Sequence, residues 1–162
     1  VGKVKAGKAE HKKDMPMIML AHNVPYVATA SVGYMQDMLN KIEKATKIKG
    51  FRYIQIFTPC PTGWRSDTAK SIELAKQAVD CGMFTLFEAE YGRLTITKKP
   101  KMTPVKDYLM SQGRFRHLKD EQIEEIQRWV NEKWKRDEAL AKTYQELYAK
   151  EEPKRVPAAN PQ

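Results

Sequence analysis

The sequence contains only two cysteines, Cys60 and Cys81, which are too few for a framework of disulfide bonds. We therefore expect a cytoplasmic protein. The sequence also lacks a glycine-rich phosphate loop, a nucleotide-binding fingerprint and a nucleophile elbow, so nothing in it predicts a complete site for a diphosphate cofactor. The three histidines, His11, His22 and His117, are too dispersed to suggest a metal site of their own.

Long apolar runs are missing as well. The longest purely apolar stretch runs from Met15 to Ala21, far short of the roughly 20 residues that a membrane-spanning helix needs. We therefore expect no membrane span. The lysines before this stretch suggest the start of a signal peptide, but His22, Asn23 and Pro25 interrupt the apolar run and a strand follows directly. We reject a signal peptide for this reason.

The sequence has an excess of basic residues, with 29 lysines and arginines against 20 acidic residues and a net charge of +9. Such a balance suits nucleic acid, an anionic membrane surface or an acidic partner protein. Here the basic residues are scattered, acids accompany them through the C-terminal third, and there is no zinc-finger spacing or compact basic block. We therefore expect no nucleic-acid binding and keep it only as a third alternative.

Apolar periodicity predicts an α/β fold. A near-continuous apolar run at 24–30 is typical of a buried parallel strand, and a second strand is predicted at 51–57. Apolar residues recur at helical spacing over 34–48, namely at Met35, Met38, Leu39, Ile42 and Ala45. Strand, helix and strand with short connections form a right-handed parallel βαβ unit. Because one such unit cannot cover both faces of a parallel sheet, we expect other polypeptide to complete the sheet.

The flanking sequence predicts further helices and a hairpin. Asp14 is expected to cap a short helix that starts near Pro16. A second helix, capped by Ser66 or Asp67, should end at Gly82. The other predicted elements are hairpin strands at 83–90 and 94–97, a linker at 98–104, a short helix at 105–112 and a long amphipathic helix that begins near Asp120.

The loop Thr58–Arg65 is the strongest candidate for a functional site. It follows the strand at 51–57, so Cys60 lies just beyond the carboxyl end of a strand, where open α/β sheets bind ligands. Pro59 and Pro61 restrict the loop, and Gly63 permits a tight turn. A fixed thiol at that edge is a candidate metal or cluster ligand, although a lone cysteine is more often a small buried hydrophobe. Any further cluster ligands would have to come from outside the chain.

The other residues near this loop leave two interpretations open. Trp64 and Arg65 could cover a cofactor and supply positive charge beside an anionic cluster, or they could be a packing anchor and a surface residue. Cys81 lies one residue before the glycine that ends its helix, which favours packing at the end of that helix.

Three separated motifs resemble the C-terminal part of the beta subunit of pyruvate:ferredoxin oxidoreductases and related 2-oxoacid:ferredoxin oxidoreductases. The motifs lie at 21–31, 58–65 and 112–118, and the similarity runs from about Lys12 to about Leu118 in the same order and spacing. The resemblance implies a fold that is part of a parallel-sheet thiamine-diphosphate-binding domain, with a C-terminal hairpin and a helical extension. It also implies that Cys60 is the fourth ligand of a 4Fe-4S cluster whose rim Trp64 and Arg65 shape.

This resemblance carries expectations about the division of the chain. They are a basic arm or loop at 1–14, the C-terminal half of the thiamine-diphosphate-binding domain with its cluster-ligand loop at 15–97, a helical C-terminal extension at 98–150 and a flexible tail at 151–162. The family's Gly-Asp-Gly motif and its other cluster cysteines are absent, and the chain begins with Val1 rather than methionine. We therefore expect a fragment or a processed product that is not active alone.

The implied reaction is oxidative decarboxylation of a 2-oxoacid with coenzyme A, which yields an acyl-CoA, carbon dioxide and reduced ferredoxin, as in anaerobic metabolism. The implied cofactors are thiamine diphosphate, magnesium and the 4Fe-4S cluster, bound mostly by residues outside this chain. The implied partners are the missing N-terminal half of the beta subunit, the other oxidoreductase subunits and ferredoxin. The form of the Thr58–Arg65 motif favours pyruvate, with branched-chain or aryl 2-oxoacids as rivals. The alternative from another class is a non-catalytic assembly module that retains the fold.

Overall fold

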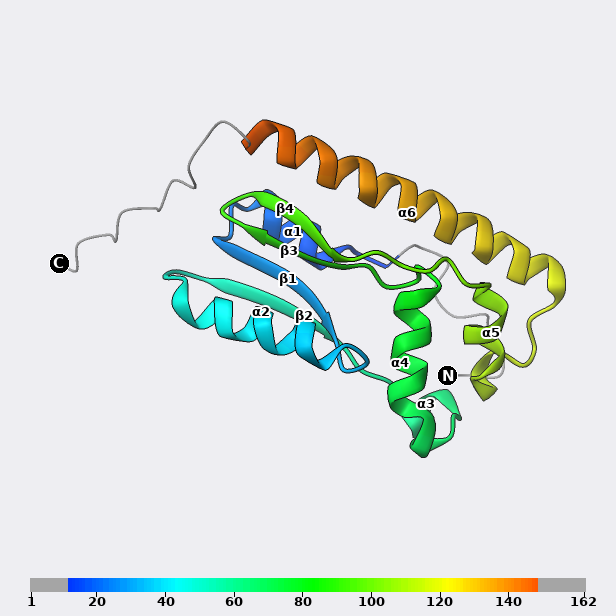
Figure 1. Ribbon diagram of the computed structural model, residues 1–162. Helices are drawn as coiled ribbons and strands as arrows, with labels where there is room; N and C mark the ends of the chain where they lie inside the picture. The colour runs from blue at the N-terminus through cyan, green and yellow to red at the C-terminus, as the bar shows by residue number, and fades with distance from the viewer. Residues whose placement is uncertain (1–11, 149–162) are drawn as a thin grey trace.

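The computed structural model describes residues 12–148, which form a four-stranded sheet with helices on both faces (Figure 1). The strands are β1 (Tyr26–Ser31), β2 (Arg52–Phe57), β3 (Leu86–Glu90) and β4 (Arg93–Lys98), in the spatial order β2-β1-β3-β4. β1 and β2 are parallel, with Tyr26 opposite Arg52 and Ser31 opposite Phe57, whereas β3 is antiparallel to both β1 and β4. The predicted α/β class, parallel pair and hairpin are confirmed, and together they make a mixed sheet.

The central strand β1 is buried along its whole length, as its apolar run predicts. Its neighbour β2 lies at one edge of the sheet and is only partly buried. Among residues 12–148 no strand pairs with the outer side of β2, so its outer backbone groups lack a ladder partner there.

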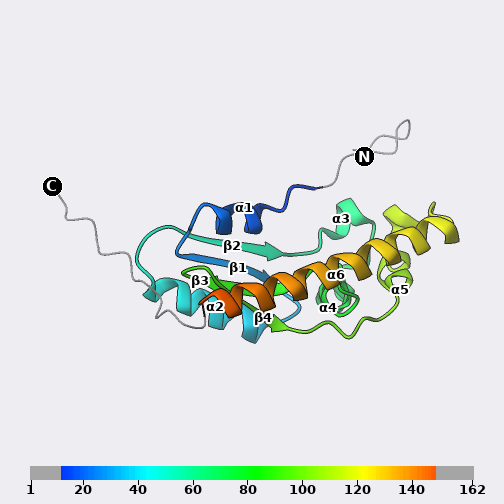
Figure 2. The same ribbon diagram turned by 90° about the horizontal axis from the view of Figure 1, so that it is seen from above.

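Two helices cover one face of the sheet and one covers the other. Figure 2 shows α1 (Met15–Ala21) and α2 (Met35–Lys47) on opposite sides of the strands. α6 (Asp120–Tyr148) runs along β4, and its Ala141 joins Leu20 of α1 and Val27 of β1 in one apolar cluster. On the opposite face, Ala45 of α2 packs with Tyr26 in a second cluster. Both faces of the sheet are therefore at least partly covered by this chain.

The start of α1 confirms a predicted helix cap. The backbone N–H of Met17 donates to the Asp14 carboxylate at 3.3 Å, and Pro16 occupies the first turn. Proline suits this position because its missing N–H would have no helical partner there. Within residues 12–148 no helix combines the length and the apolar character needed to cross a membrane.

A third apolar cluster lies beyond the carboxyl end of β2. It joins Leu74 of α4 (Ser71–Asp80), Leu109 of α5 (Val105–Met110) and Val130 of α6, and Phe57 and Trp64 pack against it. The short helices of this region are α3 (Pro61–Trp64), η1 (Thr68–Lys70) and η2 (Gly113–Phe115). The cysteine loop packs on this cluster through Trp64.

The structure adds two features that the sequence did not predict. The loop at 58–65 contains the single helical turn α3, and the helix expected after Ser66 begins as the 3-10 turn η1 before it continues as α4. Asp67, one of the two predicted caps, caps η1. The predicted features at 1–11 and 149–162 lie outside the described residues. The boundaries of the four expected parts of the chain stay predictions.

Candidate functional site

The cysteine loop is held in shape by one helical turn. Cys60 is the N-cap of α3, and the backbone N–H of Trp64 donates to the Cys60 carbonyl oxygen at 2.8 Å. Pro61 takes the first position of this turn, where its fixed backbone angle suits a helix. Pro59 is buried, whereas the Cys60 side chain is exposed. The loop therefore presents a fixed thiol to the outside of the described polypeptide.

Gly63 preserves space beside the sulfur. A Cβ atom at this position would lie 3.3 Å from Cys60 Sγ, which is closer than ordinary van der Waals contact. Among residues 12–148 no group of three or more histidine, cysteine or acidic residues could hold a metal ion. Cys60 is thus an exposed thiol without other metal-ligating groups around it in this part of the chain.

The loop is locked at its far end by a segment that comes much later in the sequence. The backbone N–H of Gly113 donates to the carbonyl oxygen of Arg65 at 3.0 Å. Arg65 adopts a left-handed conformation with φ +53°, which is uncommon for a residue with a side chain. A Cβ atom at Gly113 would lie 2.8 Å from both Cβ and O of Arg65, so only glycine allows this approach. Two of the three motifs identified in the sequence thus meet in space.

Arg114 completes the contact between these two motifs. Its guanidinium carbon lies 4.0 Å from the centre of the Trp64 ring and 4.5 Å from the centre of the Phe115 ring. Its Nε donates to the side-chain oxygen of Gln112 at 2.9 Å, and the fully buried Gln112 amide donates in turn to the carbonyl oxygen of Tyr108 at 2.8 Å. The guanidinium is therefore stacked and hydrogen-bonded in one orientation.

Burial has the largest influence on the pKa of Arg114. Burial lowers the pKa of the Arg114 guanidinium, while interactions with Tyr108 and with Cys60 oppose this shift. Arginine remains protonated despite such a change, so Arg114 is a fixed positive charge near the Cys60 thiol. Arg114 lies within the motif at 112–118, but no role for it was predictable because apolar periodicity carries no signal for a stacked cation.

Ser66, which follows Arg65, carries a polar atom without an assigned partner. Its Oγ is buried and has no hydrogen-bond partner among the described residues. Buried hydroxyl groups are normally hydrogen-bonded, so the Ser66 hydroxyl departs from the usual pattern. Trp64 and Arg65, the other two predicted site residues, lie in the same turn as Cys60. The backbone carbonyl oxygen of Arg65 accepts the hydrogen bond from Gly113.

Cys81 has none of these properties. It is buried at the end of α4, its Sγ lies 3.6 Å from the carbonyl oxygen of Ala78, and burial raises the pKa of its thiol. A buried thiol of this kind packs like a small apolar group and is poorly reactive. The structure thus separates the two cysteines into one exposed candidate ligand and one core residue.

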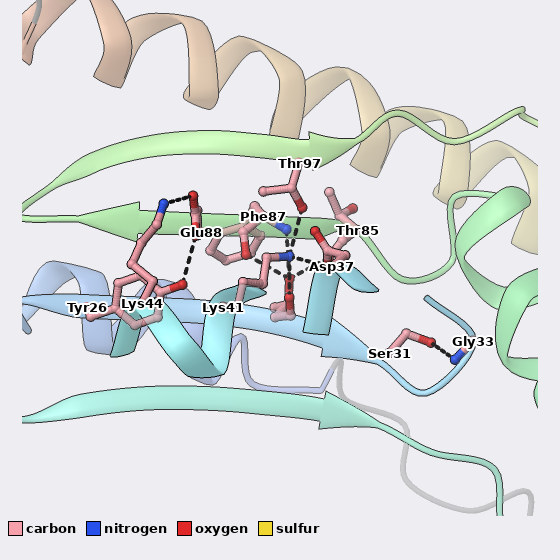
Figure 3. Close-up of polar contacts among 11 residues, drawn as sticks. Tyr26, Ser31, Gly33, Asp37, Lys41, Lys44, Thr85, Phe87, Glu88 and Thr97 are labelled. Atoms are coloured by element: carbon pink, nitrogen blue, oxygen red, sulfur yellow. Dashed lines mark hydrogen bonds and ion pairs between the residues drawn. The ribbon is translucent and has the colours of Figure 1, made fainter. Parts of the chain in front are cut away.

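A second polar cluster lies on the face of the sheet that α2 covers (Figure 3). The ammonium group of the buried Lys41 donates to the Asp37 carboxylate at 2.6 Å, to the Thr97 hydroxyl at 2.7 Å and to the carbonyl oxygen of Thr29 at 2.8 Å. Burial lowers the pKa of Lys41, and Asp37 opposes the shift. All three N–H bonds are used, so this lysine ties α2 to β1 and β4 and offers no donor to a ligand.

Three further residues, Lys44, Glu88 and Tyr26, extend this polar cluster on the face that α2 covers. Lys44 forms an ion pair with Glu88 at 2.5 Å, and the Tyr26 hydroxyl donates to the other Glu88 oxygen at 2.8 Å, as Figure 3 shows. Glu88 thus links α2 and β1 from its place on β3. The charged and polar groups of this cluster pair with one another, so the cluster joins helix α2 to the sheet.

The fold and the cysteine loop together define an α/β polypeptide that presents one exposed thiol beyond the carboxyl end of a parallel strand. Comparison with known proteins finds sequences that are similar to the chain. The chain is 47% identical over 139 residues to a ketoisovalerate oxidoreductase subunit VorB of Pyrococcus furiosus, 83% of the chain and 44% of that protein. It is 49% identical over 130 residues to a pyruvate synthase subunit PorB of Methanocaldococcus jannaschii, 80% of the chain and 44% of that protein.

A third relative agrees with the first two. A pyruvate synthase subunit PorB of Methanothermobacter marburgensis is 47% identical over 131 residues, 80% of the chain and 46% of that protein. No family model matches the chain. The chain is therefore similar in sequence to the PorB subunits of pyruvate synthase and the VorB subunits of ketoisovalerate oxidoreductase, and the resemblance predicted from its motifs is confirmed. The chain spans less than half the length of these relatives.

Proposed function

We propose that the chain is the C-terminal portion of the beta subunit of a 2-oxoacid:ferredoxin oxidoreductase and that Cys60 is a ligand of its 4Fe-4S cluster. The enzyme converts a 2-oxoacid and coenzyme A to an acyl-CoA and carbon dioxide, and the electron pair released reduces ferredoxin. The observation that carries the proposal is the exposed Cys60 thiol in a loop locked by Gly113, in a chain homologous to oxidoreductase subunits.

The chemistry around Cys60 fits one corner of an iron–sulfur cluster. Cysteine thiolates are the usual ligands of such clusters, and this one is exposed beside a glycine. The fixed cation Arg114 stands near the thiol and favours an anionic group there. When bound, the cluster would supply the exit route for electrons, and the residues of this loop would hold and orient it.

Thiamine diphosphate and magnesium do not fit the described residues in the same way. No glycine-rich loop is present to cradle a diphosphate, and no acidic cluster among residues 12–148 could hold the metal ion. We therefore assign no step of the reaction at that cofactor to this chain. The residues that bind it would belong to polypeptide outside the described part.

The surface of the chain supports the presence of such polypeptide. The side chains Met35, Leu39 and Ile42 of α2 are 48%, 50% and 37% exposed, although the apolar pattern predicted that they face a core. On the opposite face an apolar groove of about 1350 Å³ is lined by Met17, Ile56 and Trp129, among others. Together with the open edge of β2, these exposed apolar surfaces are places where the polypeptide that the relatives have and this chain lacks could pack.

Within the proposed class the form of the Thr58–Arg65 motif favours pyruvate as the substrate, with the branched-chain 2-oxoacids as rivals. Relatives named for pyruvate and for ketoisovalerate match the chain at 49% and 47% identity, a difference too small to decide between them. An aryl 2-oxoacid is the more distant alternative. The relatives' names favour an enzyme component over a non-catalytic assembly module. A location in the cytoplasm remains part of the proposal.

Anaerobic purification of the chain in its native assembly tests this function. Mass spectrometry should find accompanying polypeptide that carries a Gly-Asp-Gly motif and additional cysteines, and the assembly should contain iron, acid-labile sulfide and thiamine diphosphate. A native assembly that lacks both that polypeptide and iron would contradict the proposal and favour an assembly module.

A further inference from the structure

The guanidinium of Arg114 is held in a fixed position next to the cysteine loop. Stacking on Trp64 and Phe115 and the bond from its Nε to Gln112 fix its guanidinium from several sides. Gln112 is itself fully buried and bonded to Tyr108, so the support extends into the core. No other described arginine of this region is held in this way, because Arg65 and Arg116 are exposed.

The position of Arg114 is set relative to Cys60 by a short chain of contacts. Trp64, on which Arg114 stacks, is bonded through its backbone N–H to the Cys60 carbonyl oxygen at 2.8 Å. The neighbouring bond from Gly113 to Arg65 fixes the two segments against each other. Arg114 is therefore held against the segment that carries Cys60, close enough for an electrostatic interaction between the two side chains.

A fixed cation beside an iron–sulfur cluster has a defined effect. Reduction adds one negative charge to the cluster, and a nearby positive charge stabilises the reduced form more than the oxidised form. The interaction is stronger where protein packing replaces water than at an open surface. A half-buried, oriented guanidinium is thus better placed to act than a solvated lysine.

We propose that Arg114 is a positioning residue whose charge raises the reduction potential of the cluster bound by Cys60. This inference rests on the proposed function. The cluster, when bound, would pass electrons from the oxidation of the 2-oxoacid to ferredoxin one at a time, and the charge of Arg114 would favour its reduced form. No covalent bond forms or breaks at Arg114, and Arg114 transfers no proton.

The test is a potentiometric titration of the assembled oxidoreductase, followed by electron paramagnetic resonance. The relevant cluster is identified as the signal that a Cys60→Ala variant loses. Arg114→Gln should keep this signal and the iron content but shift the midpoint potential to a more negative value. Arg114→Lys, which retains the charge, should lie closer to the parent, and Arg116→Gln should match the parent.

Three results would overturn the inference. They are an unchanged midpoint potential in Arg114→Gln, equal shifts in Arg114→Gln and Arg114→Lys, or loss of the cluster in both variants, which would show support of the loop alone. These outcomes differ from failure of the proposed function, in which Cys60→Ala itself would leave every cluster signal in place.

Discussion

The backbone N–H of Gly113 donates to the carbonyl oxygen of Arg65 at 3.0 Å, and this bond joins two motifs that are far apart in the sequence. It holds the end of the cysteine loop against η2 and brings Arg114 onto Trp64. The geometry of the candidate site therefore depends on a segment that contains no candidate ligand.

Gly113→Ala is expected to destabilise the chain. The added Cβ would lie 2.8 Å from atoms of Arg65, and relief of this overlap requires the loop to move. Such overpacking costs about 1–3 kcal/mol in the free energy of unfolding. Urea denaturation of the full chain measures the loss, with Arg116→Ala as a control on an exposed neighbour. A Gly113→Ala chain as stable as the control would contradict the close approach.

Lys41→Met should be costly although it replaces a charge by an apolar group. The change leaves Asp37, the Thr97 hydroxyl and the Thr29 carbonyl oxygen without their shared donor. The expected loss of stability is about 3 kcal/mol, because breaking a buried pair leaves its partners desolvated and unpaired.

The same helix offers a matched control for Lys41→Met. Lys47 forms an ion pair of the same spacing with Glu43, at 2.6 Å, but both side chains are exposed. Lys47→Met should therefore change the free energy of unfolding by less than about 0.5 kcal/mol. Equal effects of the two substitutions in chemical denaturation would show that Lys41 does not tie α2 to the sheet.

The buried hydroxyl of Tyr26 is expected to make the folded chain less stable at alkaline pH. Burial, followed by the hydrogen bond to Glu88 and the charge of that carboxylate, raises the pKa of the Tyr26 hydroxyl. An unfolded tyrosine ionises near pH 10 while the folded Tyr26 keeps its proton, so folding is favoured fully below about pH 10 and progressively less above it. The free energy of unfolding should fall by up to about 1.4 kcal/mol per pH unit above this pH on account of Tyr26. Tyr26→Phe should show a shallower slope, and identical slopes would refute this assignment.

The sequence predicted the parts of the fold that depend on local signals. The apolar run at 24–30 became the fully buried β1, and the cap at Asp14 formed as expected. α3 was missed because Pro61 and Gly63 are typical of loops. In the structure Cys60 takes the N-cap position of this turn, and Gly113 bonds to Arg65 at its other end.

Long-range contacts limited the prediction of the buried faces. Periodicity assigned Leu39 and Ile42 to a core, yet the structure buries Lys41 instead. A lysine is buried when acceptors from other strands surround it, and here those are the Thr29 carbonyl oxygen and the Thr97 hydroxyl. No pattern within α2 carries this information.

The position of the candidate ligand Cys60 was predictable from the sequence, but the contacts that surround it were not. The proline-flanked Cys60 beyond a strand was visible in the sequence, and the structure shows its thiol exposed. The stacking of Arg114 on Trp64 depends on how two distant loops pack, which periodicity and spacing do not encode. The role of Cys60 as a cluster ligand stays a prediction.

The most direct test compares Cys60→Ala with Cys81→Ala in the assembled oxidoreductase, purified without oxygen. Electron paramagnetic resonance of the reduced enzyme and iron analysis give the readout. The account predicts that Cys60→Ala loses one cluster signal, its share of the iron and electron transfer to ferredoxin, whereas the buried Cys81→Ala retains all three. An unchanged spectrum and iron content in Cys60→Ala would contradict it.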